Sequence, residues 1–192
     1  MDKKNIFVIG LNDFNLGELK SIEEADNYNF IRIFNKKELQ EDSDKPDLEM
    51  FLNKARKEIK GFGGNVDGII GFFDFPVTLL AFVLSHEFET LAPTLESAFK
   101  CEHKYWSRLE QKKVISDNIP EFEPINPFDP PDFDDIKLKK PFWMKPVKSF
   151  ASQLGFKIEN RDEYENNLKK IRGDIHKFAD PFNYLLSFIE LP

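Results

Sequence analysis

Three short apolar runs, each followed by a segment with helical spacing, constrain the fold of the first half of the chain. Buried parallel strands are short and continuously apolar, and their alternation with helices is typical of a sheet with right-handed crossovers. The runs cover residues 5–11, 30–34 and 66–73, and the helical segments cover residues 16–25, 48–59 and 74–88. The sequence therefore predicts a parallel-sheet, Rossmann-like α/β domain over residues 1–93.

Local signals mark the boundaries of two of these predicted helices. Pro46 and Asp47 precede the second helical segment, and Gly61-Phe62-Gly63-Gly64 follows it as a stop signal. Asp74, two residues before Pro76, is expected to cap the third helix rather than to act as an acid or base. The polar stretch 35–47 is interpreted as a loop or a frayed helix.

The second half of the chain, residues 94–192, has a different texture. Thr94 is expected to cap one helix that continues to about Ile115. Prolines and aspartates over 120–141 predict a solvated surface connection, with one short edge strand near Phe122 and no calcium site. Two strands at 142–147 and 154–158 and a helix at 161–172 then predict a small α+β lobe. The expected fold class is α/β, with this lobe following the parallel-sheet domain.

Charge and composition exclude several classes of function. The chain has 192 residues, 27 Lys and Arg against 34 Asp and Glu, and a net charge of −7, which argues against binding of nucleic acid through bulk charge. No apolar run approaches the roughly 20 residues that cross a bilayer. The single cysteine, Cys101, cannot form an internal disulfide, so we expect a cytoplasmic protein. From the net charge and the lengths of the apolar runs, we expect no nucleic-acid or membrane partner.

A lysine inside an apolar segment offers the clearest chemical signal. Residues 141–158 read Pro-Phe-Trp-Met-Lys-Pro-Val-Lys-Ser-Phe-Ala-Ser-Gln-Leu-Gly-Phe-Lys-Ile, which places Lys145 on a strand before a loop of small residues and a returning strand. An ammonium group held beside N–H and hydroxyl donors suits a polyphosphate. Trp143 and Trp106 are expected to be packing residues.

The order of these segments resembles the ATP-grasp superfamily, whose members join a carboxylate to an amine or similar nucleophile through an acyl phosphate. The resemblance rests on the segments Val66-Asp67-Gly68-Ile69-Ile70-Gly71, Asp74-Phe75-Pro76, Lys104 on a helix, Ile119-Pro120-Glu121-Phe122 and Trp143-Met144-Lys145-Pro146. It implies a pre-ATP-grasp domain over 1–93 and a partial ATP-grasp nucleotide-binding lobe over 94–192. It also implies that Lys104 and Lys145 contact the ATP phosphates, and that the loop 148–154, with Ser149 and Ser152, covers them.

Simpler interpretations of these residues stay open. Lys104 could be a solvent-facing helix lysine, and Ser149 and Ser152 could be ordinary turn residues. The family's cover loop is rich in glycine, whereas Ser149, Ala151 and Leu154 stand at its glycine positions here. Because serine and alanine tolerate a positive φ poorly, backbone contacts from this loop to phosphate are not expected to match the family's.

The family's hinge, arginine and Glu/Asn magnesium pair have no counterpart in this sequence. We therefore expect ATP and Mg²⁺ as cofactors with the magnesium ligands outside this chain, no catalytic residue within it, and a truncated chain that is inactive by itself. The expected partners are a nucleotide and a small carboxylate, with either a homo-oligomer or a missing C-terminal portion covering the apolar tail 178–192. The alternative is a non-catalytic protein-interaction module that uses this tail as its contact surface.

Overall fold

The computed structural model describes residues 2–40 and 47–189, and its contacts divide the chain into two compact units. Unit 1 comprises Met1–Ala98 and Pro181–Pro192, and unit 2 comprises Phe99–Asp180. The contacts thus place residues 181–189 in unit 1, whereas the functional boundary at residues 93 and 94 stays a prediction.

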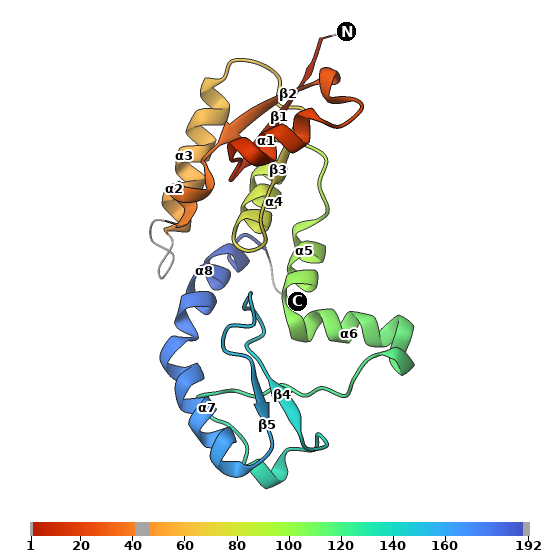
Figure 1. The fold of residues 1–192 in the computed structure, drawn as a ribbon, viewed down its shortest axis with the longest axis vertical. Helices are drawn as coiled ribbons and strands as arrows, with labels where there is room; N and C mark the ends of the chain where they lie inside the picture. Colours follow the sequence, from red (N-terminus) through yellow and green to blue (C-terminus); the bar gives the residue numbers. More distant parts are fainter. Residues whose placement is uncertain (1, 41–46, 190–192) are drawn as a thin grey trace. The chain divides into compact units, whose positions relative to one another are not determined.

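A three-stranded parallel sheet forms the centre of unit 1 (Figure 1). Its strands are β1 (Lys4–Ile9), β2 (Tyr28–Ile33) and β3 (Gly68–Gly71), in the order β2-β1-β3. Phe7 of β1 pairs with Ile31 on one side and with Ile69 on the other. The predicted parallel α/β class is confirmed, because each of the three apolar runs contributes one strand.

The helices of unit 1 follow the predicted order with shifted ends. They are α1 (Asp13–Lys20), η1 (Ala25–Asn27), α2 (Lys36–Gln40), α3 (Leu48–Gly61) and α4 (Val77–Glu87), and α5 (Leu95–Glu102) begins in this unit. The short helix α2 falls within the stretch interpreted as a loop or frayed helix, of which residues 41–46 lie outside the described residues.

The boundaries of α3 show how local sequence fixes a helix. Asp47 Oδ1 accepts a hydrogen bond from the backbone N–H of Met50 at 2.8 Å, which caps the first turn. Past the end of the helix, Gly63 has a φ of +72°, which a glycine adopts without steric cost. One face of α3 is buried, and the buried residues are Leu48, Phe51, Leu52, Ala55 and Ile59.

Helix α4 begins later than predicted, so the expected capping role of Asp74 is wrong. Pro76 occupies the N-cap position and provides no side-chain hydrogen bond. Asp74 instead accepts the N–H of Phe75 through Oδ1 at 2.7 Å, and its carbonyl accepts the N–H of Val77 at 3.0 Å. The turn before α4 therefore uses the carbonyl and one carboxylate oxygen of Asp74, and the helix begins only after it.

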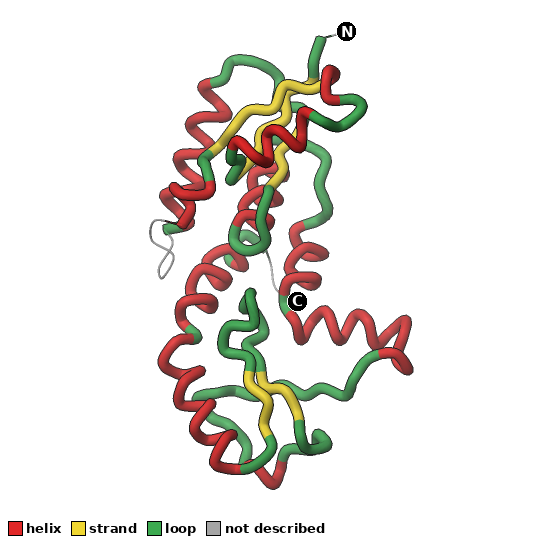
Figure 2. The backbone as a smooth tube through the Cα atoms, viewed as in Figure 1, coloured by secondary structure: helices red, strands yellow, loops and turns green. Residues whose placement is uncertain are grey.

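Unit 2 is a small α+β lobe built on a two-stranded antiparallel sheet (Figure 2). Strands β4 (Phe142–Met144) and β5 (Phe156–Ile158) pair, and α7 (Arg161–Asp174) contacts β5. Helix α6 (Lys104–Ile115) and the 3-10 helices η2 (Ser116–Asn118) and η3 (Phe133–Asp135) complete the lobe before β4. Its core consists of Phe133, Ile136, Phe142, Met144, Ile158, Tyr164, Leu168 and Ile171.

The strand predicted near Phe122 is wrong. Residues 119–126 have no strand or helix in the structure, and Pro120 and Pro124 interrupt the N–H donors that a sheet ladder needs. Phe122 instead contacts the ring of Tyr105, with centroids 5.6 Å apart. The proline-rich connection thus attaches to α6 through aromatic packing.

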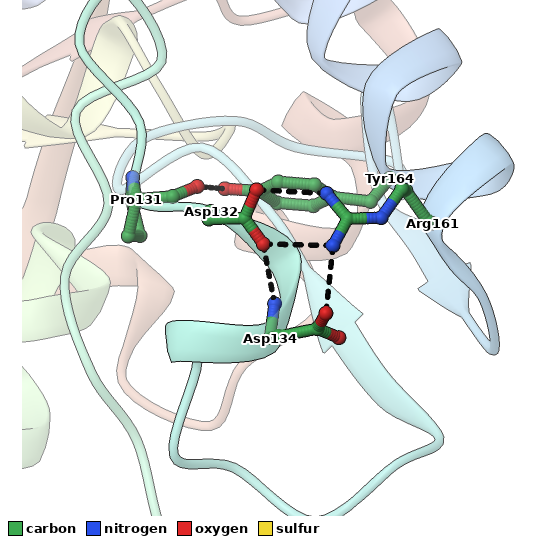
Figure 3. A network of polar contacts seen from close by, with 5 residues as sticks. All are labelled: Pro131, Asp132, Asp134, Arg161 and Tyr164. Carbon is green, nitrogen blue, oxygen red and sulfur yellow. Dashed lines mark hydrogen bonds and ion pairs between the residues drawn. The ribbon is translucent and has the colours of Figure 1, made fainter.

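The acidic part of this connection is ion-paired, which the prediction of a solvated loop did not include. Arg161, the first residue of α7, donates to both carboxylate oxygens of Asp132 and to Asp134, each at 2.8 Å (Figure 3). Arg161 lowers the pKa of Asp132 to about 2. The Tyr164 hydroxyl donates to the carbonyl of Pro131 at 3.0 Å. Together these contacts hold the connection against the start of α7.

The apolar tail is largely packed, so the expectation that it needs a partner surface is wrong for its described residues. Helix α8 (His176–Leu186) buries Phe178, Phe182 and Leu185, which are 4%, 3% and 0% exposed. Within unit 1, the ring of Phe182 lies 6.0 Å from that of Phe75. In the part of the chain that the structure describes, no helix has both the length and the apolar character to span a bilayer.

Candidate phosphate-binding site

A helix break at His103 sets the position of Lys104. The sequence predicted one helix from Thr94 to Ile115, whereas the structure has two, because His103 adopts an extended conformation with φ −87° and ψ 106°. His103 Nδ1 accepts the N–H of Trp106 at 3.2 Å, and the two rings stack at 4.2 Å. Burial lowers the pKa of His103, which keeps Nδ1 unprotonated as an acceptor. Lys104 therefore becomes the first residue of α6.

Lys104 contacts the loop that follows β4. Its backbone N–H donates to the carbonyl of Val147 at 2.8 Å. Its ammonium group, Nζ, donates to the carbonyl of Ser149 at 2.8 Å and to the Ser149 hydroxyl at 3.3 Å. Two of the four predicted site residues, 45 positions apart, thus share direct hydrogen bonds.

Lys145 lies directly after β4 on the exposed side of the strand. Phe142 and Met144 are each 7% exposed, whereas Trp143 is 63% exposed. The packing role expected for Trp143 is therefore wrong. Lys145 Nζ lies 5.5 Å from the centre of the Trp143 ring. An exposed indole and an ammonium group therefore share one face of this strand.

The loop 148–154 adopts a left-handed conformation without glycine. Ala151, Ser152 and Leu154 have φ values of 49°, 58° and 54°. Ser152 is exposed, and its carbonyl accepts the N–H of Gly155 at 3.2 Å. The loop thus takes up the positive φ angles that the sequence argument considered unfavourable for these residue types, and two of the three stand at predicted glycine positions.

The sequence interpretation missed a buried ion pair at the base of this loop. Lys148 donates to the carboxylate of Glu102, the last residue of α5, and the two side chains are 5% and 15% exposed. The signal in the sequence is the strand period of two, which places Lys148 on the same side as Phe142 and Met144, and the structure buries all three. A lysine at such a position needs a carboxylate partner.

The described residues do not fit a magnesium site. Among them no group of three or more His, Cys, Asp or Glu side chains could hold a metal ion. Cys101 is exposed and free. The candidate site therefore consists of cationic, hydroxyl and backbone groups, which suit an anion.

Comparison with known proteins gives a relationship at the level of fold. No family model matches the sequence, and no curated protein matches it. Among solved structures, an L-amino acid ligase from Bacillus licheniformis superposes with a TM-score of 0.58 at 18% sequence identity. The match covers 90% of this chain and 43% of the ligase chain. The chain therefore has the α/β fold of a portion of that ligase.

Proposed function

We propose that this chain is the ATP-binding portion of an ATP-dependent ligase that joins a carboxylate to an amine or another nucleophile. The fold similarity to part of an L-amino acid ligase supports this class. The resemblance of the Lys104 and Lys145 segments to the ATP-grasp superfamily supports the same class independently, because it rests on sequence alone.

One observation carries the proposal: the Lys104 ammonium group lies against the loop after β4. The carbonyl and hydroxyl of Ser149, which accept from this ammonium group, are neutral oxygens. A phosphate oxygen is a stronger acceptor for an ammonium group than either, because both partners are then charged. A phosphate oxygen of a triphosphate would therefore replace the Ser149 oxygens as the acceptor of the Lys104 ammonium group. The triphosphate would then lie beside the loop that is expected to cover its phosphates.

The other site residues have assigned roles in this proposal. Lys145 neutralises charge on the same phosphates, and the exposed Trp143 ring beside it offers a flat surface for the base. Ser149 and Ser152 provide hydroxyl donors from the loop. The remaining described residues do not provide a magnesium cage, so the metal ligands are assigned to protein outside this set.

The proposed reaction has two steps. The substrate carboxylate oxygen attacks the γ-phosphorus of ATP, which breaks the bond to ADP and forms an acyl phosphate. The amine then attacks the acyl carbon, releases inorganic phosphate and loses a proton. In the first step, the two lysines of this chain stabilise charge on the phosphate oxygens as the bond to ADP breaks.

Calorimetric titration of the full chain with Mg-ATP tests the proposal. Lys104→Met and Lys145→Met keep the length of each side chain and remove its charge. Losing one charge-assisted hydrogen bond costs about 1.5–3 kcal/mol, which is roughly a 10- to 150-fold increase in Kd. Lys112→Met is the matched control, because Lys112 is an exposed residue of the same helix, near the Phe122 ring.

The outcomes separate clearly. The proposal predicts saturable binding by the wild type and by Lys112→Met, with strongly weakened binding by the other two variants. It is refuted if the wild type shows no saturable heat with Mg-ATP, or if all three variants bind as the wild type does. The interaction-module alternative loses the contact surface that it assigned to the tail, because Phe178, Phe182 and Leu185 are packed.

A further inference from the structure

We infer that Glu102 and Lys148 are positioning residues of the phosphate site: their buried ion pair fixes the base of the cover loop, so that only its tip moves over a ligand. The inference rests on the proposed function for the identity of the ligand. The loop base is defined here as residues 147–150 and the loop tip as residues 151–153.

The ion pair joins two segments that are far apart in sequence. Glu102 ends α5, Lys148 follows β4, and the two residues are 46 positions apart. Lys148 is 5% exposed, so its charge is removed from bulk water and depends on groups of the protein for compensation. Loss of the Glu102 carboxylate would remove a charge that compensates this nearly buried ammonium group, which would weaken the attachment of the loop base to α5.

Further contacts converge on the same loop base. The Val147 carbonyl accepts the N–H of Lys104, and the Ser149 carbonyl accepts its ammonium group. The ring of Phe150 meets that of Phe178 edge to face, with centroids 5.5 Å apart. Without a ligand, each residue of the base thus has a contact outside the loop, and a phosphate bound to the Lys104 ammonium group would replace that of Ser149 alone.

The tip is built differently. Residues 151–153 are exposed, and Ala151 and Ser152 adopt left-handed φ angles. The Gln153 N–H donates to Phe150 at 3.0 Å, and the Ser152 carbonyl accepts from Gly155, so these hydrogen bonds stay within the loop region. A tip held by local turns beside an anchored base can change conformation without displacing the base.

The ion pair also keeps Glu102 from competing for the phosphate-binding lysine. Glu102 lies only two residues before Lys104 in sequence, and a free carboxylate there would attract the same ammonium group as a phosphate does. Pairing with Lys148 engages that carboxylate. A triphosphate would then replace the neutral Ser149 acceptors of Lys104.

Hydrogen exchange of the full chain without nucleotide tests the positioning role directly. Glu102→Gln keeps the shape of the side chain and removes its charge. Glu110→Gln is the control, because Glu110 of α6 pairs with Lys113 of the same helix and with Lys100 of α5. Exchange of the loop base is read from the amide of Lys104, whose N–H donates to the Val147 carbonyl. The inference predicts roughly tenfold faster exchange of this amide in Glu102→Gln, with β5 and α7 unchanged. Calorimetry should show a roughly tenfold higher Kd for Mg-ATP in this variant, with Glu110→Gln unchanged.

A double variant keeps the test decisive if Glu102→Gln folds poorly. Glu102→Leu with Lys148→Met replaces both charges by apolar side chains of similar size, which preserves stability. The inference predicts a folded protein whose loop base still exchanges fast. It is overturned if the base of either folded variant exchanges as in the wild type, or if exchange rises equally in α7. Absence of ATP binding by the wild type would refute the proposed function and leave the exchange result as the test of the ion pair.

Discussion

Replacing Ala151 by glycine should stabilise the protein, because Ala151 has a φ of 49° in an exposed part of the loop. A residue with a Cβ atom pays about 1–2 kcal/mol in the left-handed region. Glycine avoids this cost but loses about 0.5–1 kcal/mol more conformational entropy on folding. The difference predicts a gain of about 0.5–1 kcal/mol in the free energy of unfolding for Ala151→Gly.

The same substitution in a helix should have the opposite sign. Ala179 lies within α8, and its N–H donates to the carbonyl of Ile175 at 2.9 Å. Ala179→Gly should therefore lose about 1 kcal/mol. Urea unfolding of both variants, monitored by circular dichroism, measures the two changes in the free energy of unfolding. The m-values of the variants should equal that of the wild type. A loss of stability in Ala151→Gly comparable to that in Ala179→Gly would refute the left-handed loop conformation.

Two further predictions concern the contacts of the proline-rich connection with α7. The pKa of Asp132 is depressed to about 2 in the folded protein, so its contribution to stability is complete above its unfolded value of 3.8 and is lost as the pH falls through about 2. Urea midpoints between pH 5 and pH 2 should fall more steeply for the wild type than for Asp132→Asn, and parallel curves would contradict the pairing with Arg161. Tyr164→Phe should lower the free energy of unfolding by about 0.5–1.5 kcal/mol, because Pro131 loses its donor; an unchanged value in urea unfolding would exclude that hydrogen bond.

Local sequence signals predicted much of the fold. The three apolar runs became the three parallel strands, and Asp47 and the glycines after α3 marked the ends of that helix. The lobe with β4, β5 and α7 was also predicted. These features depend on residues close together in sequence, which is why period and capping could reveal them.

Features that depend on distant residues were not predicted. Nothing in the sequence around His103 marks it as a helix N-cap, because histidine is not a usual capping residue. Arg161 was read only as the start of a polar helix, since its partners Asp132 and Asp134 precede it by 29 and 27 residues. Glu102, the partner of the loop residue Lys148, likewise lies 46 positions away, at the end of α5.

The candidate site was predictable in part for the same reason. The resemblance identified Lys104, Lys145, Ser149 and Ser152, and the structure shows the contact of Lys104 with Ser149. The shared role of all four toward one phosphate group stays a prediction. Sequence alone could not show the left-handed loop, since its residue types disfavour that conformation.

A crystal structure of the full chain with magnesium and a non-hydrolysable ATP analogue tests the central claim most directly. The account predicts that Nζ of Lys104 and Nζ of Lys145 each lie about 2.7–2.9 Å from phosphate oxygens of the same nucleotide, with Lys104 released from Ser149. A nucleotide bound elsewhere, or one that contacts neither lysine while Lys104 keeps its hydrogen bonds to Ser149, would contradict it.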